Sequence, residues 1–178
     1  MKKIIYLSVA CAAFLFASCN SGNKQNNSTE DTSGAAATMP SNSAAANIPG
    51  LSSVALSDTI HLTGNDQMHY NQTLFKVNAG KTITLTFKNV GTQASMTHDV
   101  TVLQPGTNVD TLGIHVALAK SIDNLSATDK SQIIAHTKMT GPGQEDSITF
   151  TLPNPGVYEF MCTYPGHYAS MHGNIVAQ

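Results

Sequence analysis

Short runs of alternating apolar and polar residues recur from Leu51 to the end of the chain. In residues 81–88 the alternation puts Ile83, Leu85 and Phe87 on one face of an extended strand, as expected where one face of a sheet is buried. Comparable runs, separated by turn-forming residues such as Gly, Pro and Asn, occupy 74–77, 99–103, 146–152, 156–161 and 173–177. The spacing predicts an all-β protein built as an antiparallel β-sandwich.

One segment of the chain has a different period. From Asp110 to about Asn124, apolar residues follow one another at helical spacing. These are Leu112, Val116, Ala119 and Ile122. The pattern predicts one short helix inserted between strands.

The N-terminus has the features of an export signal. Lys2 and Lys3 precede an apolar run over residues 4–17, which is too short for a comfortable membrane span. The run ends in small residues followed by Cys19, which resembles a bacterial lipoprotein processing site. We therefore expect residues 1–18 to be a lipoprotein signal peptide and Cys19 to carry lipid. An ordinary signal peptide that is cut nearby is the alternative.

Residues 19–50 have the composition of a linker. They are rich in Ser, Asn, Thr, Ala and Gly, and Met39 and Ile48 are their only large apolar residues. Such a segment cannot bury enough surface to offset the entropy of ordering it. We expect a disordered linker that is either a passive spacer or a tether allowing the domain 51–178 to move between partners.

Charge and cysteine content narrow the function. All nine basic residues are lysines, and removal of Lys2 and Lys3 leaves seven against eleven acids, a formal net charge of −4. The absence of arginine argues against binding of nucleic acid or phosphate. Of the three cysteines, Cys11 leaves with the signal and Cys19 takes lipid, so Cys162 has no partner for a disulfide.

A loop near the C-terminus holds Cys162, His167 and Met171, and His98 lies upstream. Two imidazoles, one thiolate and a weak thioether are the donors of a blue-copper electron-transfer site. Each residue taken alone is more often structural than a ligand. Their order and spacing, with Pro165-Gly166 between Cys162 and His167, favour copper because a hydrophobic core has no need of them.

The loop resembles the azurin branch of the cupredoxins, whose pattern is Cys-x4-His-x3-Met. Other segments similar to azurins are 65–68 with Tyr70-Asn71, 134–138 and 146–150, and the likeness runs from about Leu56 to Val176. The resemblance implies a Greek-key β-sandwich, a helix or flap near 110–124, and one type 1 Cu(I)/Cu(II) ion. The lack of a disulfide departs from most azurins.

The resemblance also implies a role for each site residue. His98, Cys162 and His167 would form a trigonal plane, with Met171 as a weak axial donor and the carbonyl of Thr97 on the opposite side. The residue after Cys162, Thr163, agrees with the family.

Asp99 stands where azurins generally have Asn, whose amide braces the copper loop. Either Asp99 is held protonated, or it accepts hydrogen bonds from the region of Thr163. A solvent-facing Asp99 without influence on the site is a further alternative. An ionised Asp99 would favour Cu(II), so we expect Asp99→Asn to raise the reduction potential.

In azurins the electron passes through the second histidine, here His167, whose ring edge lies within an apolar docking patch. The residues that match this patch are Met68, Met96, Tyr164, Pro165, Gly166 and Ala169. Ser170 stands where a large apolar residue is common. We expect transient redox partners, namely a cytochrome-type donor or an oxidase or reductase acceptor, and a monomeric carrier. Five further histidines are expected to have no role at the copper site: His61, His69, His115, His136 and His172.

Three classes of function remain to be compared. The first is an electron carrier on the periplasmic side of a bacterial cell envelope, held by lipid, with the outer membrane favoured because Asn20 is not an inner-membrane retention residue. The second is a periplasmic copper-buffering or copper-delivery protein, although exposed Met- and His-rich tracts are missing from the sequence. The third, a copper enzyme, needs a second catalytic copper, for which one domain of ~125 residues lacks room.

Overall fold

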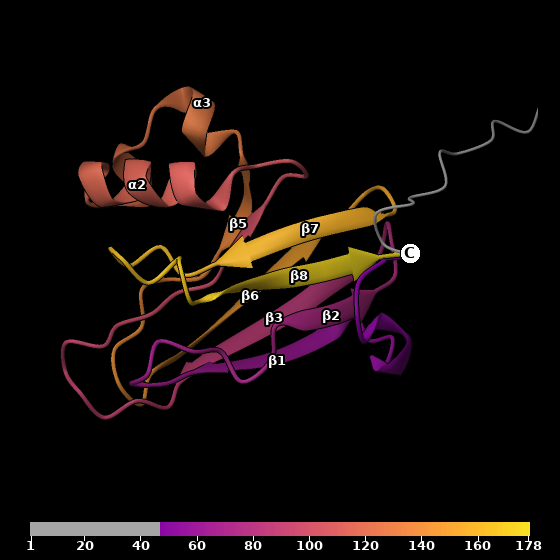
Figure 1. Ribbon diagram of the computed structural model, residues 1–178, viewed down its shortest axis with the longest axis horizontal. Helices are drawn as coiled ribbons and strands as arrows, with labels where there is room; N and C mark the ends of the chain where they lie inside the picture. Colours follow the sequence, from indigo (N-terminus) through magenta and orange to yellow (C-terminus); the bar gives the residue numbers. More distant parts are fainter. Residues whose placement is uncertain (1–46) are drawn as a thin grey trace, which may run out of the picture. The chain divides into compact units, whose positions relative to one another are not determined.

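The computed structural model describes residues 47–178, and these form two β-sheets with a helical segment at one side (Figure 1). The smaller sheet has the strand order β1-β3-β6 and the larger has β2-β8-β7-β4-β5. The strands are β1 (Thr59–Gly64), β2 (Leu74–Val77), β3 (Thr82–Asn89), β4 (Thr101–Leu103), β5 (Ile133–His136), β6 (Glu145–Thr151), β7 (Gly156–Met161) and β8 (His172–Ala177). Because the chain changes sheet after β1, β2, β3, β5 and β6, the two layers are interlocked.

The predicted antiparallel arrangement is only partly right. β1 pairs with β3, and β2 with β8, in parallel, whereas the other four described strand pairs are antiparallel. Alternation along one strand reports which face is buried but carries no information about the direction of its neighbour. The parallel pairs join strands that do not follow one another in the sequence, and the residue pattern does not indicate which strands pair.

The main core lies between the sheets. Ile83, Leu85 and Phe87 all point inward from β3 and are at most 1% exposed, as the alternation predicted. Tyr70 and Phe160 also belong to this core. The ring of Tyr70 lies edge-on to that of Phe87, with 5.9 Å between the ring centroids, and its centroid lies 5.4 Å from that of Phe160. The aromatic cluster fills the interior close to the end of the sandwich where the predicted copper donors lie.

The predicted helix is present but shorter than expected. Helix α2 covers Val109–Ala119 and is capped at its start by the Asn108 side chain, which accepts a hydrogen bond from Thr111 N–H at 2.8 Å. It ends because Lys120 adopts the left-handed conformation with φ 64°. The following residues form two short separate elements, the 3₁₀ turn η2 (Ile122–Asn124) and the four-residue helix α3 (Ala127–Lys130). A further 3₁₀ turn, η1 (Leu51–Ser53), lies before β1.

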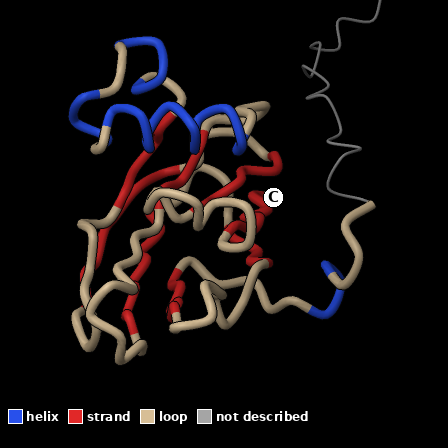
Figure 2. The backbone as a smooth tube through the Cα atoms, turned by 60° about the vertical axis from the view of Figure 1, so that its left-hand side comes forward, coloured by secondary structure: helices blue, strands red, loops and turns tan. Residues whose placement is uncertain are grey.

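A second, smaller core lies under α2. It contains Leu103, Leu112, Val116, Leu125 and Met161, with Ala119 and Ile122 packed against it. Figure 2 shows α2 and its neighbouring turns gathered on one side of the strands. All four apolar residues that suggested the helix therefore contribute to this core, including the one that lies beyond the end of the helix.

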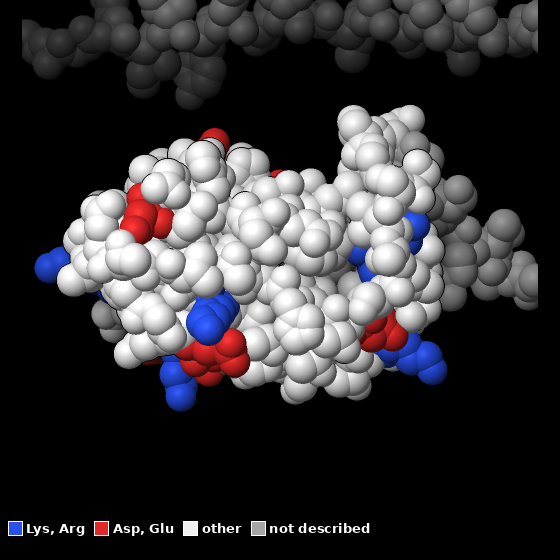
Figure 3. Space-filling view, turned by 90° about the horizontal axis from the view of Figure 1, so that it is seen from below, with Lys and Arg blue, Asp and Glu red and all other residues white. Residues whose placement is uncertain are grey.

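Charged side chains are sparse on the face seen in Figure 3, which is mostly uncharged, with lysines and acidic residues in a few small groups. Within residues 47–178 no helix is long and apolar enough to cross a membrane. The predicted signal peptide, residues 1–18, the lipidation site Cys19 and nearly all of the predicted linker lie outside the described residues, so those interpretations remain predictions.

Candidate metal centre

The four predicted side-chain donors come from two places in the fold. His98 lies just before β4 and pairs with Thr140 through backbone hydrogen bonds of 3.0 and 2.8 Å. Cys162, His167 and Met171 all lie on the loop between β7 and β8. All four are at least 96% buried. The fold therefore brings His98 to a loop that begins 64 residues further along the chain.

The loop that follows β7 is held by its own backbone. Cys162 N–H donates to the carbonyl of Met171 at 2.9 Å, and Met171 N–H donates to the carbonyl of His167 at 2.8 Å. His167 N–H in turn donates to the carbonyl of Tyr164 at 3.0 Å. Gly166 lies inside that turn with φ 84°, a conformation in which other residues are strained. The loop is thus a compact turn with its donors fixed by the main chain.

The side chains of His98, Cys162 and His167 converge. The two Nδ1 atoms are 3.1 Å apart, and Cys162 Sγ lies 4.0 Å from Nδ1 of His98 and 3.8 Å from Nδ1 of His167. Ligand atoms held about 2.0–2.3 Å from one ion in a trigonal plane would be separated by about 3.5–3.8 Å. The cluster has the donor types and the dimensions for one ion, so the residues fit a copper site.

The orientation of His98 is set by a backbone atom. Its Nε2 lies 3.1 Å from the carbonyl oxygen of Asn65, which can only accept, so Nε2 carries the proton. Nδ1 is then unprotonated and faces the cluster, as a metal ligand requires. Sequence reasoning noted the segment around Asn65 only as a likeness to azurins and gave it no role.

Burial adjusts the protonation of all three side chains. Burial lowers the pKa of His98, and burial together with the neighbouring charge of His98 lowers the pKa of His167 to about 4. Burial raises the pKa of the Cys162 thiol well above its usual range, with the charge of Asp99 acting in the same direction. At neutral pH both imidazoles are therefore neutral and ready to bind a metal, whereas the thiol must lose its proton on binding.

Asp99 is 1% exposed, which overturns the solvent-facing alternative. Its Oδ1 accepts a hydrogen bond from Thr163 N–H at 2.6 Å, and its Oδ2 accepts from the hydroxyls of Thr163 and Thr101. Burial raises the pKa of Asp99, while these hydrogen bonds act in the opposite direction. Of the two roles predicted for this carboxyl, the geometry matches the acceptor of hydrogen bonds from the region of Thr163.

The two expected axial donors, Met171 and Thr97, lie on the segments that carry the cluster: Met171 on the ligand loop and Thr97 next to His98. Met171 is fully buried, and a Cβ added to Gly64 would lie 3.2 Å from its methyl carbon, so the side chain reaches the end of β1. Thr97, whose carbonyl was predicted to face the opposite side, directly precedes His98 and lines a cavity of about 590 Å³. That cavity lies between α2 and the ligand loop, where Tyr164 and Pro165 also line it.

Residues of the predicted docking patch surround the exposed side of the loop. Pro165, Gly166 and Ala169 are exposed, whereas Met68, Met96 and Tyr164 are half-buried. Tyr164 stacks on His167 with a centroid separation of 4.5 Å. The Ser170 hydroxyl donates to the carbonyl of Met68 at 3.1 Å, so this polar residue ties the two sides of the patch together. His167 is 4% exposed, which leaves only a narrow edge of it at the surface.

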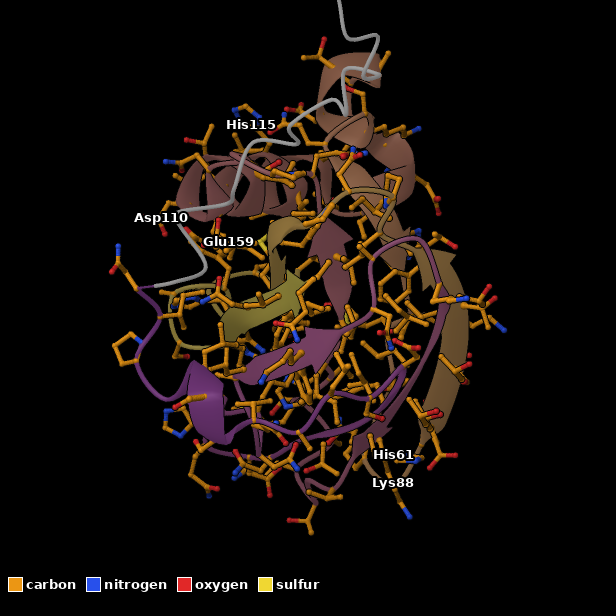
Figure 4. The ribbon with its side chains drawn as sticks, turned by 90° about the vertical axis from the view of Figure 1, so that its right-hand side faces the viewer. His61, Lys88, Asp110, His115 and Glu159 are labelled. Atoms are coloured by element: carbon orange, nitrogen blue, oxygen red, sulfur yellow. The ribbon has the colours of Figure 1, made fainter. Side chains whose placement is uncertain are left out.

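The remaining histidines do not join the cluster. His61, His69, His115, His136 and His172 are all exposed. Figure 4 shows His61 near Lys88 on the smaller sheet and His115 on α2, on different sides of the domain. His115 pairs with Asp129 at 2.9 Å. His172, which follows Met171, points outward while Met171 is buried, as expected for adjacent strand residues.

A two-sheet sandwich with a buried His₂Cys cluster and a methionine on the same loop defines a blue-copper electron carrier. The chain belongs to the plastocyanin/azurin family of copper binding proteins, whose model matches residues 57–178. The azurin-type cupredoxin resemblance, the Greek-key sandwich with a short helix, and copper as the cofactor are thereby confirmed.

Individual relatives agree with this assignment. The azurin of Pseudomonas aeruginosa is 33% identical over 125 residues, covering 66% of this chain and 82% of that protein. Outer membrane protein H.8 of Neisseria gonorrhoeae is 36% identical over 116 residues, and the match covers 62% of each chain. The crystal structure of auracyanin from Roseiflexus castenholzii superposes with a TM-score of 0.63 at 39% identity, covering 70% of this chain and 99% of that one.

Proposed function

We propose that this protein carries single electrons between redox proteins in a bacterial cell envelope, with His98, Cys162, His167 and Met171 as copper ligands and the Thr97 carbonyl as a distant fifth contact. The observation that carries the proposal is the convergence of three buried donors from two parts of the fold. When bound, the copper ion supplies one-electron chemistry by alternating between Cu(II) and Cu(I).

The protein's own residues would hold the donors, exclude water and provide the path for the electron. The backbone hydrogen bonds of the ligand loop and the bond from His98 to Asn65 hold the donors in one arrangement, so little needs to move when the charge changes. Burial of Cys162 and Met171 keeps water away from the donors. The narrow exposed edge of His167, beside Pro165, supports it as the point of electron entry and exit.

The residues around His167 support a transient docking surface. Met68, Met96, Tyr164, Pro165, Gly166 and Ala169 would contact a cytochrome-type donor or an oxidase or reductase acceptor over a small area. A small interface permits rapid release, which a carrier with alternating partners needs. We further propose that the protein acts as a monomer. We also propose that it is not an enzyme, because one domain offers no room for a second, catalytic copper.

Copper buffering is less well supported. A labile buffer needs accessible sulfur and imidazole donors, whereas those of Cys162, His167 and Met171 are buried in a loop fixed by its backbone. The methionines of the described domain other than Met171 are spread along the chain and do not form a Met-rich tract.

The optical and EPR spectra of the protein with one equivalent of Cu(II) test the ligand set. We expect an intense red-absorbing thiolate-to-copper band and a narrow hyperfine splitting, both lost reversibly on addition of ascorbate. Cys162→Ser should bind copper without that band. A pale, broadly split signal from the unmodified protein would reject the type 1 site and favour the buffering function.

We also propose that lipid on Cys19 anchors the protein on the periplasmic side, with the outer membrane favoured over the inner. The export-like residues 1–18 support this, as does the similarity to a protein named outer membrane protein H.8. Residues 19–50 would be a tether giving the copper domain reach. Membrane fractionation of the unmodified protein and of Cys19→Ala tests the anchor: the unmodified protein should sediment with outer membranes and the variant should be soluble. Equal distribution of the two would reject it.

A further inference from the structure

The small core under α2 includes residues that flank two of the proposed copper ligands. Met161, which directly precedes Cys162, is fully buried in that core. Tyr168, which directly follows His167, packs against the same core from the ligand loop. The helical segment, which lies on the same side of the strands as this loop (Figure 1), therefore touches the chain immediately beside both donors.

Gly113 of α2 lies against the ring of Tyr168 on the ligand loop. A Cβ added to Gly113 would lie 2.4 Å from Cδ1 and 2.5 Å from Cγ of the tyrosine ring, far closer than carbon atoms can approach. These atoms are at the root of the ring, so rotation of its far end cannot relieve the clash. The ring lies directly against the backbone of the helix.

Gly113 is not required by its own backbone. It lies in the middle of α2 and is not among the residues with positive φ, so any residue could adopt its conformation. Glycine is among the poorest helix formers, and alanine at an interior position stabilises a helix about fivefold in the equilibrium constant. The space occupied by Tyr168 explains why the helix carries a glycine here.

We propose that Tyr168 is a positioning residue for the copper centre: α2, through the space left by Gly113, holds the tyrosine ring and so fixes the segment between His167 and Met171. This inference rests on the proposed function, since it takes those two residues as ligands. It assigns the inserted helix a part in shaping the metal site, in addition to covering the sheet.

The hydrogen bonds of the loop explain how the position of the ring reaches the donors. Tyr168 lies inside the turn that is closed by the bonds from Met171 N–H and Ser170 N–H to the carbonyl of His167. A shift of the ring moves the backbone of this turn, and with it the ligands at both its ends. Tyr164, which precedes His167 in the chain, stacks on the imidazole ring. His167 is therefore held by one tyrosine before it and one after it in the sequence.

A double-mutant cycle on the copper-free full chain tests the contact without reference to the metal. In the unmodified background, Gly113→Ala should raise the unfolding equilibrium constant about tenfold or more, because of the clash. In the Tyr168→Ala background the same change should lower it by about fivefold, because only the better helix former remains. Gly141→Ala, where the nearest atom would be 3.5 Å away, is the matched control and should give the same small effect in both backgrounds. Effects of Gly113→Ala that are equal in the two backgrounds would overturn the inference.

The second readout is the copper spectrum, which a purely structural contact would leave unchanged. Tyr168→Ala should shift the visible band, the hyperfine splitting and the reduction potential, whereas Tyr168→Phe, which keeps the ring, should match the unmodified protein. This comparison remains informative if Gly113→Ala fails to fold. Identical spectra and potentials for the Ala and Phe variants would overturn the inference. Absence of a blue spectrum from the unmodified protein would instead count against the proposed function, and the copper-free cycle would still decide the contact.

Discussion

Asp99 and Thr163 are joined by two hydrogen bonds, one from the backbone N–H of Thr163 to Oδ1 at 2.6 Å and one from its hydroxyl to Oδ2. The pair connects the residue after one proposed ligand, His98, to the residue after another, Cys162. Because both are buried, the bonds are protected from competition with water. This link braces the centre with a carboxyl where azurins generally have an amide.

We predict that Asp99→Asn raises the reduction potential, on the order of tens of millivolts, because it removes a buried negative charge that favours Cu(II). The variant should fold, since its amide oxygen can still accept from Thr163 N–H while the hydroxyls of Thr101 and Thr163 turn to accept from the amide nitrogen. Protein-film voltammetry measures the potential. An unchanged value would mean that no charge resides on Asp99.

The buried hydroxyl of Tyr70 donates to the carbonyl of Asp99 at 2.5 Å. Tyr70→Phe should lower the free energy of unfolding by about 1–2 kcal/mol, because it leaves that buried carbonyl without its partner. Tyr158→Phe is a suitable comparison, since its hydroxyl bonds the carbonyl of Asn154 in a more accessible place. Urea unfolding of the copper-free protein should show the larger loss for Tyr70→Phe, and a larger loss for Tyr158→Phe would contradict this account.

The docking patch can be tested without knowledge of the partners. Met96→Asp should slow electron self-exchange between two copies of the protein by about tenfold or more, because like charges would meet where the copies dock. The blue absorption should be unchanged. Leu56→Asp carries the same net charge and alters an exposed residue that pairs with Lys76 on β2. NMR line broadening of mixed oxidation states gives the rates, and equal slowing by both variants would place docking elsewhere.

Acid should weaken the hydrogen bonds between the Asp66 carboxylate and the backbone of Thr92 and Gln93. The carboxylate accepts these bonds from Thr92 N–H and Gln93 N–H, and they lower the pKa of Asp66 below the usual 3.8. The folded state therefore binds this proton less readily than the unfolded state, so the stabilisation is fully present above about pH 4 and is lost as the pH falls through the folded pKa. Asp66→Asn should be less stable than the unmodified protein at pH 7, and the gap should narrow below pH 4. A constant gap in urea midpoints from pH 7 to 3 would refute this.

Much of the site could be predicted from the sequence because its chemistry resides in residue types at fixed spacing. Cys162, His167 and Met171 lie on one short loop, so their proximity needs no knowledge of the fold. The alternation over 81–88 likewise reports a buried strand face directly. Both patterns are local, and both were found in the structure.

Other features could not be predicted because they depend on backbone atoms or on empty space. The carbonyl of Asn65 orients His98 from 33 residues away. Because every residue has a backbone carbonyl, the sequence does not indicate which one accepts this hydrogen bond. Gly113 is needed because it has no side chain, which leaves room for the ring of Tyr168. The end of α2 at Lys120 was missed because the apolar period continues through the next turn, where Ile122 enters the same core without being helical.

The parallel pairing of β2 with β8 sets the order in which the molecule can be completed. Among the described strands β2 pairs only with β8, with Leu74 facing Asn174 and Val77 facing Ala177. The larger sheet therefore cannot close until β8 is available, and pairing over such a long range slows folding because a long loop must be closed first. Three of the proposed copper ligands lie on the loop just before β8 and are held in place by it. Full coordination by His98, Cys162 and His167 thus requires the larger sheet, because His98 precedes β4, the ligand loop joins β7 to β8, and all three strands belong to that sheet.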